Sequence, residues 1–402
     1  MNPSHRPPRR RPATPFLTLN LRPAVRAAAL ALAAVLVLGT AAALLAPLST
    51  WLPGGGRHPP PDDGDRGPAS PPGGGDRVAP GVRLWDHDLS GWTRAQVAEW
   101  LTALAPGLRR DPVPARIDPV TRGVIPELAG ARLDVAATLE AVLAARAGTA
   151  VEPRFDWIEP EVTMADFPLA PVYQGNPQRR QVTLMINVAW GNEELAQMLD
   201  ILDAEGVRTT FFLVGRWAER YPDLARAVAE RGHEIASHGY SDAAAIGSLD
   251  YQAARADLER AHRVITEVTG REPRWFSPHR GEWSPALLEA CRDLGYRLFL
   301  WTVDTIDWQD PDRGTLLARV LDRAVPGALV LMHPRPVTVD ALPDMIRGLR
   351  RHGLEPVPLG TLLDPHLPPD PAETGLPGGA TAQRAGPPDP RTGDAWWGAR
   401  VP

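Results

Sequence analysis

Hydrophobic residues follow two alternating spacings from residue 181 to residue 363. Short runs rich in β-branched and aromatic residues predict strands, and longer runs with an apolar stripe every three or four residues predict helices. The expected strands are 181–188, 209–214, 274–276, 297–300, 328–332 and 355–357, and the expected helices include 194–204, 217–230 and 251–268. This order predicts an α/β fold with a parallel sheet, open or closed into a barrel. In such folds the chemistry lies at the carboxyl ends of the strands.

A separate hydrophobic pattern over residues 81–167 predicts a small α+β module. Thr93 and Gln96 form a capping box before one apolar-striped helix, Asp134 caps a second helix, and residues 151–158 alternate as a strand. Residues 116–134, together with the segments that follow, resemble the small α+β peptidoglycan-binding domain. That resemblance implies a cell-wall ligand, and the alternative is a spacer domain without a ligand.

The first part of the chain predicts export. A basic arginine-rich head (1–26) precedes an uncharged apolar run (27–48), which has about the length that a helix needs to cross a bilayer. The arginines before this run, and the acidic residues soon after it, place the N-terminus in the cytoplasm and the bulk of the chain outside the membrane. We expect a single-pass membrane anchor. The alternative is a signal peptide that is cleaved after the small residues 41–43, which gives a secreted protein.

Two segments are too polar, and too rich in Pro and Gly, to form a core. They are the linker 49–80 and the tail 365–402. We expect both to be disordered, because such segments bury too little apolar surface to offset the entropy of ordering.

Composition excludes two classes of function. The chain has 43 basic residues, all of them arginine, a net charge of -5 and a pI near 6.1. This balance lacks the basic excess of a nucleic-acid-binding protein, so we expect no nucleic-acid partner. The single cysteine, Cys291, excludes an internal disulfide, and its apolar helical surroundings favour a small buried residue over a nucleophile.

Polar and aromatic residues gather where the predicted strands end. The first strand is followed by NVAWGNE (187–193), the next unit leads to GHEIASHGYSD (232–242), and the later strands lead to SPHRG (277–281), WTVDTIDW (301–308) and LVLMHP (329–334). A histidine with an aspartate four residues later, as in His238 and Asp242, is by itself weak evidence for a metal site. The order of all five segments carries more weight.

In this order the segments resemble the polysaccharide deacetylases, also called the NodB-homology group or carbohydrate esterase family four. The resemblance covers residues 178–364 and implies a distorted (β/α) barrel. It also implies hydrolysis of N-acetyl groups on an N-acetylhexosamine polymer such as peptidoglycan, with one divalent metal, zinc or cobalt. The first motif is similar to that of a divergent branch associated with sporulating bacteria.

The resemblance carries over unevenly to the metal and base positions. Ala189 occupies the position of the family's catalytic base and Trp190 that of its metal-binding aspartate. His238 matches the first metal histidine, and Asp242 occupies the position of the second. Ser277 replaces the arginine that orients the base. We therefore expect weak metal binding through His238 and Asp242, or none.

The remaining site positions match better. The resemblance makes His333 the acid that protonates the leaving amine, and we expect Asp304 to accept the hydrogen bond of its ring N–H. Trp301, Trp308 and Gly281 are the expected substrate-binding positions, although core packing is the alternative for both tryptophans. Glu193, Glu194 and His279 are candidate substitutes for the lost ligands or base. His233 is expected to be structural.

The sequence therefore predicts an exported, membrane-anchored protein of the cell wall. It has two possible functions: a polysaccharide deacetylase with a degenerate site, or a catalytically inert protein that binds glycans or serves as a scaffold in the cell envelope.

Overall fold

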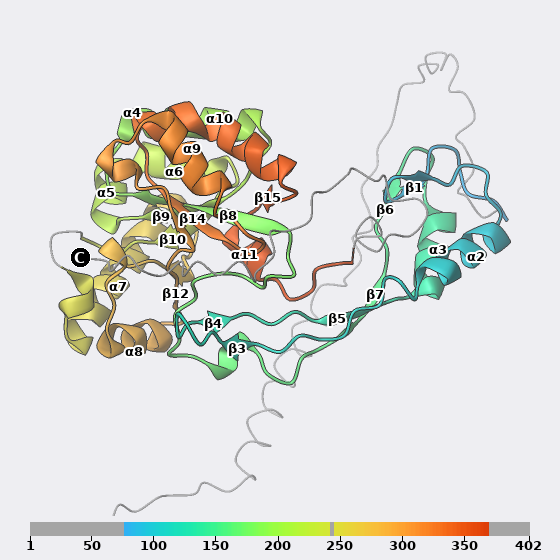
Figure 1. Ribbon diagram of the computed structural model, residues 1–402, viewed down its shortest axis with the longest axis horizontal. Coiled ribbons are helices and arrows are strands. Elements are labelled where there is room, and N and C mark those ends of the chain that lie inside the picture. The colour runs from blue at the N-terminus through green and yellow to red at the C-terminus, as the bar shows by residue number, and fades with distance from the viewer. Residues whose placement is uncertain (1–75, 242–244, 370–402) are drawn as a thin grey trace, which may run out of the picture. The chain divides into compact units, whose positions relative to one another are not determined.

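The computed structural model describes residues 76–241 and 245–369 (Figure 1). The expected basic head, the membrane segment 27–48, most of the linker and nearly all of the tail lie outside the described residues, and so does Asp242. Within the described ranges, no helix is both long enough and apolar enough to cross a membrane.

Eight strands form one curled parallel sheet, as the alternating pattern predicts. Its order is β12-β11-β10-β9-β8-β14-β13, and β15 pairs with β8 outside this path. The strands are β8 (Gln181–Val188), β9 (Thr210–Leu213), β10 (Glu234–Ser237), β11 (Trp275–Phe276), β12 (Arg297–Leu298), β13 (Val303–Asp304), β14 (Leu329–Met332) and β15 (Glu355–Pro356). All pairings within this sheet are parallel, so the carboxyl ends of its strands meet at one edge.

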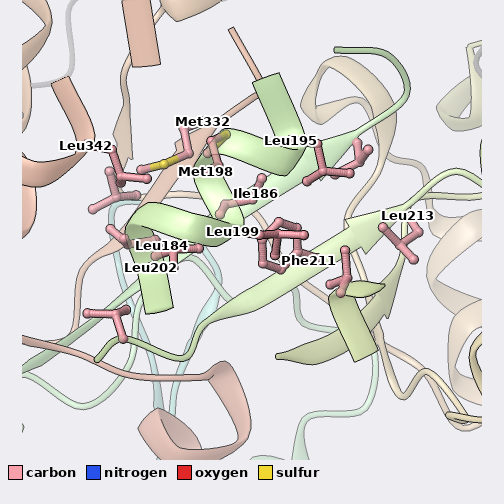
Figure 2. Packing of buried hydrophobic residues seen from close by; sticks show 14 of the residues in the cluster. Leu184, Ile186, Leu195, Met198, Leu199, Leu202, Phe211, Leu213, Met332 and Leu342 are labelled. Atoms are coloured by element: carbon pink, nitrogen blue, oxygen red, sulfur yellow. The ribbon is translucent and has the colours of Figure 1, made fainter. Parts of the chain in front are cut away.

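The central strand β8 is buried on both faces. Leu184 and Ile186 pack into the cluster that joins the sheet to its helices, which Figure 2 shows with Leu195, Met198 and Leu199. Met185, between them in sequence, belongs to a different cluster on the opposite face. Because successive strand residues point to opposite faces, this apolar run requires cover on both sides of the sheet.

The connections between the strands are mostly helical. These helices are α4 (Asn192–Ala204), α5 (Gly215–Arg220), α6 (Pro222–Glu230), α7 (Tyr251–Thr269), α8 (Pro285–Asp293), α9 (Arg313–Leu321), α10 (Pro336–Arg351) and, after β15, α11 (Leu359–Leu363). The single helix expected at 217–230 is wrong. Tyr221 leaves the helical region, with φ -127° and ψ 59°, and Pro222 starts the second helix. A proline disfavours helical geometry at the residue before it and is well placed at the first helical position.

Two strands of this eight-stranded sheet are missing from the sequence prediction. Strand β10 looks like a turn with a short apolar pair, and β13 has only two residues. Each strand is defined by its pairing with neighbouring strands: Ile235 pairs with Phe211 of β9, and Asp304 pairs with Leu331 of β14. Strands this short are defined by pairing with distant residues, because their own pattern is too brief to identify them.

The first described part of the chain contains further short elements. They are β1 (Arg83–Leu84), β2 (His87–Asp88), α2 (Arg94–Leu104), β3 (Arg116–Ile117), β4 (Val124–Ile125), β5 (Gly130–Leu133), α3 (Val135–Ala144), β6 (Ala150–Val151) and β7 (Phe155–Ile158). The capping box of Thr93 and Gln96 is confirmed, and Asp134 caps α3. The strand expected at 151–158 splits into β6 and β7, with Pro153 between them.

Candidate functional site

Strand alternation brings the candidate side chains to the inner face of the curled sheet. Met185, Ala236 and Leu329 belong to the cluster on that face. Residues two or four positions later face the same way at the carboxyl ends of β8, β10 and β14. By this alternation Asn187, His238 and His333 gather at one edge of the sheet.

His333 is held by a buried carboxylate. Its ring Nδ1–H donates to Asp307 Oδ1 at 2.8 Å, and its backbone N–H donates to Asp307 Oδ2 at 2.6 Å. The Thr338 hydroxyl donates to the same Oδ2 at 2.7 Å, and the Asp307 side chain is 0% exposed. These contacts fix the tautomer of His333, so that its Nε2 can accept a proton or donate one toward a bound molecule.

The expected partner of His333, Asp304, is therefore wrong, and Asp307 takes that place. Asp304 Oδ1 accepts instead from the backbone N–H of Ile306 at 2.8 Å. Burial raises the pKa of the Asp304 carboxyl. The sequence motif contained both aspartates, but the choice between them depends on the turn that follows β13.

That turn has an unusual backbone. Ile306 and Asp310 both have positive φ, 55° and 49°. A β-branched residue such as Ile306 strongly disfavours this region, so the surrounding contacts must hold it there. The turn buries Asp307 and leaves the adjacent Trp308 51% exposed at the same edge of the sheet.

A hydrogen bond defines the tautomer of His238. Its Nδ1–H donates to the Ser277 carbonyl at 2.6 Å, which leaves the lone pair of Nε2 available as an acceptor or ligand. Burial, followed by the nearby His279, holds the pKa of His238 well below its ordinary value. The two imidazole centroids lie 4.0 Å apart. Of the candidate substitutes, His279 is therefore the one that the structure brings to His238.

The described side chains do not form a complete site for a divalent metal. In the part of the chain that the structure describes, no group of three or more His, Cys, Asp or Glu side chains could hold a metal ion. Glu193 and Glu194 lie in the first turn of α4, and the second ligand expected from the sequence, Asp242, lies outside the described residues. Zinc sites use at least three protein ligands, so the described site lacks a complete set.

Trp190 lies on the imidazole of His333. The two ring centroids are 5.3 Å apart and the planes differ by 14°, which is a stacked arrangement. The indole remains 42% exposed, and Ala189 beside it presents only a methyl group. The segment after β8 therefore brings an aromatic surface to His333 and no carboxylate at either position.

The backbone at Gly191 fixes this arrangement. Gly191 has φ +80°, and a Cβ atom there would lie 2.2 Å from the Pro334 carbonyl oxygen. Only glycine allows such an approach between the loop after β8 and the residue after His333. Next along the chain, the Asn192 side chain accepts from the Trp217 indole N–H at 2.8 Å.

Among the residues that the structure describes, two buried polar atoms near this edge have no hydrogen-bond partner. They are Asn187 Oδ1, at the end of β8, and Ser277 Oγ, after β11. The Ser277 side chain cannot supply the charge of an arginine at that position. Gly281 packs closely on Trp301, since a Cβ there would lie 2.9 Å from the indole. This contact gives the half-buried Trp301 a packing role.

His233 and Cys291 lie elsewhere. His233 is 4% exposed, and its Nδ1 accepts from the Thr209 backbone N–H at 3.3 Å. Burial lowers the pKa of His233 to about 4, and burial raises the pKa of the Cys291 thiol to about 12. Both values fit structural residues, because a charged form of either is unfavourable at neutral pH.

Comparison with known proteins agrees with this fold. Residues 174–299 match the polysaccharide deacetylase family. An uncharacterized protein of Bacillus subtilis, YlxY, is 33% identical over 266 residues, which are 66% of this chain and 82% of the relative. A peptidoglycan-N-acetylglucosamine deacetylase of Bacillus cereus is 27% identical over 215 residues, which are 52% of this chain and 74% of the relative.

Solved structures show the same relationship. The structure of a pseudoenzyme of carbohydrate esterase family four from Bacillus anthracis is similar, with a TM-score of 0.60 and 33% identity over 67% of this chain and 95% of that one. A mutant of that pseudoenzyme with restored enzymatic activity has a TM-score of 0.60 and 32% identity, over 67% of this chain and 98% of the other. The chain therefore belongs to the polysaccharide deacetylase family, carbohydrate esterase family four.

Proposed function

We propose that this chain binds an N-acetylhexosamine polymer of the cell envelope at the carboxyl ends of its strands, and that it hydrolyses N-acetyl groups slowly or not at all. The observation that carries the proposal is the pair of residues after β8. Ala189 and Trp190 stand where family resemblance implies a base and a metal ligand, and Trp190 stacks on His333.

The combined loss of the base carboxylate and of the arginine that orients it supports this proposal. A base carboxylate and the arginine that orients it form one charge-assisted unit, and removing one partner alone would leave an unpaired charge. Ala189 and Ser277 replace both members of that unit. A similar protein from Bacillus anthracis is a pseudoenzyme, and a mutant of it has restored enzymatic activity, which supports the proposal.

A slow hydrolase is the second candidate function. It is favoured by the His333–Asp307 pair, which is complete and buried. A histidine held in this way can protonate a leaving amine, so the acid half of the reaction needs no new residue. The missing half is the activation of water.

Acetate release separates the two candidates. Purified full-length protein is incubated with peptidoglycan and with chitotetraose, and we expect little or no acetate above the blank. A variant that combines Ala189→Asp, Trp190→Asp, Ser277→Arg and Asp242→His should release more acetate than the four single variants combined, because the groups act as one unit. The same variant with His333→Ala serves as the control and should lose the gain.

The metal content of the purified protein is an independent test of the proposal. We expect at most weak zinc or cobalt binding by the unmodified protein, and His238→Ala should remove it, whereas His333→Ala should leave it unchanged. Rapid metal-dependent turnover by the unmodified protein would contradict the proposal. It would point to Glu193, Glu194 or His279 as working substitutes.

We also propose that residues 81–167 direct the protein to peptidoglycan. Hydrogen bonds from Val124 to Pro171 and from Ala129 to Pro365 join this part to the rest of the chain, so binding is best compared in long versions. A protein spanning 76–369 should pellet with purified sacculi more completely than one spanning 168–369. Equal pelleting of the two proteins would mean that residues 81–167 serve only as a spacer.

A further inference from the structure

Trp190 is too exposed to be explained as core packing. Large aromatic side chains contribute most when buried, yet 42% of this residue faces solvent at the edge of the sheet where His333 lies. One face of the indole lies on the imidazole, with 5.3 Å between centroids. The remaining surface is therefore available to a bound molecule.

The backbone beside Trp190 and the imidazole on which its indole lies are both fixed before any ligand binds. On its C-terminal side, Gly191 approaches Pro334 so closely that no side chain fits between them. Asn192 then begins α4 and accepts from the indole N–H of Trp217. On the other side of the stack, the His333 ring is fixed by Asp307. A preorganised aromatic surface loses little conformational freedom on binding, which favours affinity.

Trp190 stands next to the polar groups that a sugar requires. A pyranose ring has an apolar face of C–H groups and a rim of hydroxyl and acetamido groups. The exposed indole surface suits the apolar face, and His333 Nε2 can exchange a hydrogen bond with the rim because Nδ1–H is committed to Asp307. Trp308, which is 51% exposed, follows Asp307 in the same turn and is a second exposed aromatic side chain.

We propose that Trp190 is a sugar-stacking residue, and that its exposed indole surface binds a pyranose ring of an N-acetylhexosamine polymer. The inference rests on the proposed glycan binding and assigns a role to the side chain that stands in the place of a metal ligand. The same substitution that removes a carboxylate thereby supplies a recognition surface.

Binding of chitotetraose to the full-length protein tests this inference, with affinity measured by calorimetry. Trp190→Ala should weaken binding about tenfold, because the stacking contact between the indole and the sugar is lost. Trp190→Phe should keep most of the affinity, and Trp190→Leu, which keeps apolar volume without a ring, should behave like the alanine variant. Saturation-transfer NMR should show the strongest aromatic contact at the ring C–H protons of the sugar.

A matched control exists in the chain. Trp275 is also a half-buried tryptophan beside another ring, with 5.4 Å between its ring centroid and that of Phe299, but its indole N–H donates to Glu234 at the start of β10. Trp275→Ala should leave chitotetraose affinity unchanged. Thermal unfolding of each variant identifies any loss of fold, and the phenylalanine and leucine variants keep the comparison informative if the alanine variant fails to fold.

The outcomes are distinguishable. No binding by the unmodified protein would overturn the proposed function itself. Normal binding by the unmodified protein, with equal affinity in the alanine and leucine variants, would overturn only the role of Trp190. Tighter binding by those variants would also overturn it, since the indole would then be an obstruction.

Discussion

His333 and Asp307 are joined twice, through the ring Nδ1–H and through the backbone N–H of the same histidine, at 2.8 and 2.6 Å. One carboxylate thereby fixes both the tautomer of the imidazole and the position of the chain that carries it. Because Thr338 also donates to it, this buried side chain accepts three hydrogen bonds.

The first prediction follows from this pair. Asp307→Asn should lower the free energy of unfolding by about 2 to 4 kcal/mol, because the amide NH₂ group faces a donor wherever it is placed. Asp304→Asn is the matched control and should change stability by less than about 1 kcal/mol, since an amide oxygen can still accept from Ile306. Urea unfolding measures both. A larger loss of unfolding free energy in Asp304→Asn than in Asp307→Asn would contradict the assignment of Asp307 as the partner of His333.

The second prediction concerns Gly191. Gly191→Ala should lower the free energy of unfolding by more than about 2 kcal/mol, because the new Cβ meets the Pro334 carbonyl in a conformation that already disfavours side chains. Gly206→Ala is the control: its φ is +64°, and a Cβ there meets nothing within 4 Å. It should lose only about 1 kcal/mol. Equal losses in thermal unfolding would show that the contact with Pro334 is unimportant.

The third prediction is a pH dependence. Burial lowers the pKa of His233 to about 4. Between about pH 6.5 and pH 4 the unfolded chain therefore binds a proton that the folded protein excludes, and stability falls as the pH falls. Above this window the contribution of the neutral histidine is fully present.

His233→Asn isolates this contribution, because the asparagine oxygen can accept from Thr209 without titrating. We expect the difference in unfolding free energy between the unmodified protein and the variant to change by up to about 1.4 kcal/mol per pH unit within that window. Urea unfolding at a series of pH values measures it. Parallel curves would mean that His233 titrates normally in the folded state.

The fourth prediction concerns the proposed anchor. If residues 27–48 remain attached, the protein should keep its N-terminus and fractionate with membranes, and deletion of 27–48 should release it. N-terminal sequencing and fractionation provide the measurement. A soluble product that begins near Leu44 would instead support secretion after cleavage.

Most of the architecture can be predicted from local sequence patterns, because the interactions that produce those patterns are local. The buried run of β8 has the predicted bounds, Gln181–Val188, since eight consecutive residues of strand character need no partner to be recognised. The cap of α2 is likewise local, because Thr93 and Gln96 satisfy each other within one turn.

The contacts between polar residues of the site depend on the tertiary fold. Asp304 and Asp307 are equivalent in the sequence, and the left-handed backbone at Ile306 turns the second one toward His333. In the same way, the sequence places Trp190 at a vacant ligand position but not against an imidazole that lies 143 residues later in the printed sequence. Such contacts depend on strand order and on close approaches such as that of Gly191 to Pro334, which no local pattern encodes.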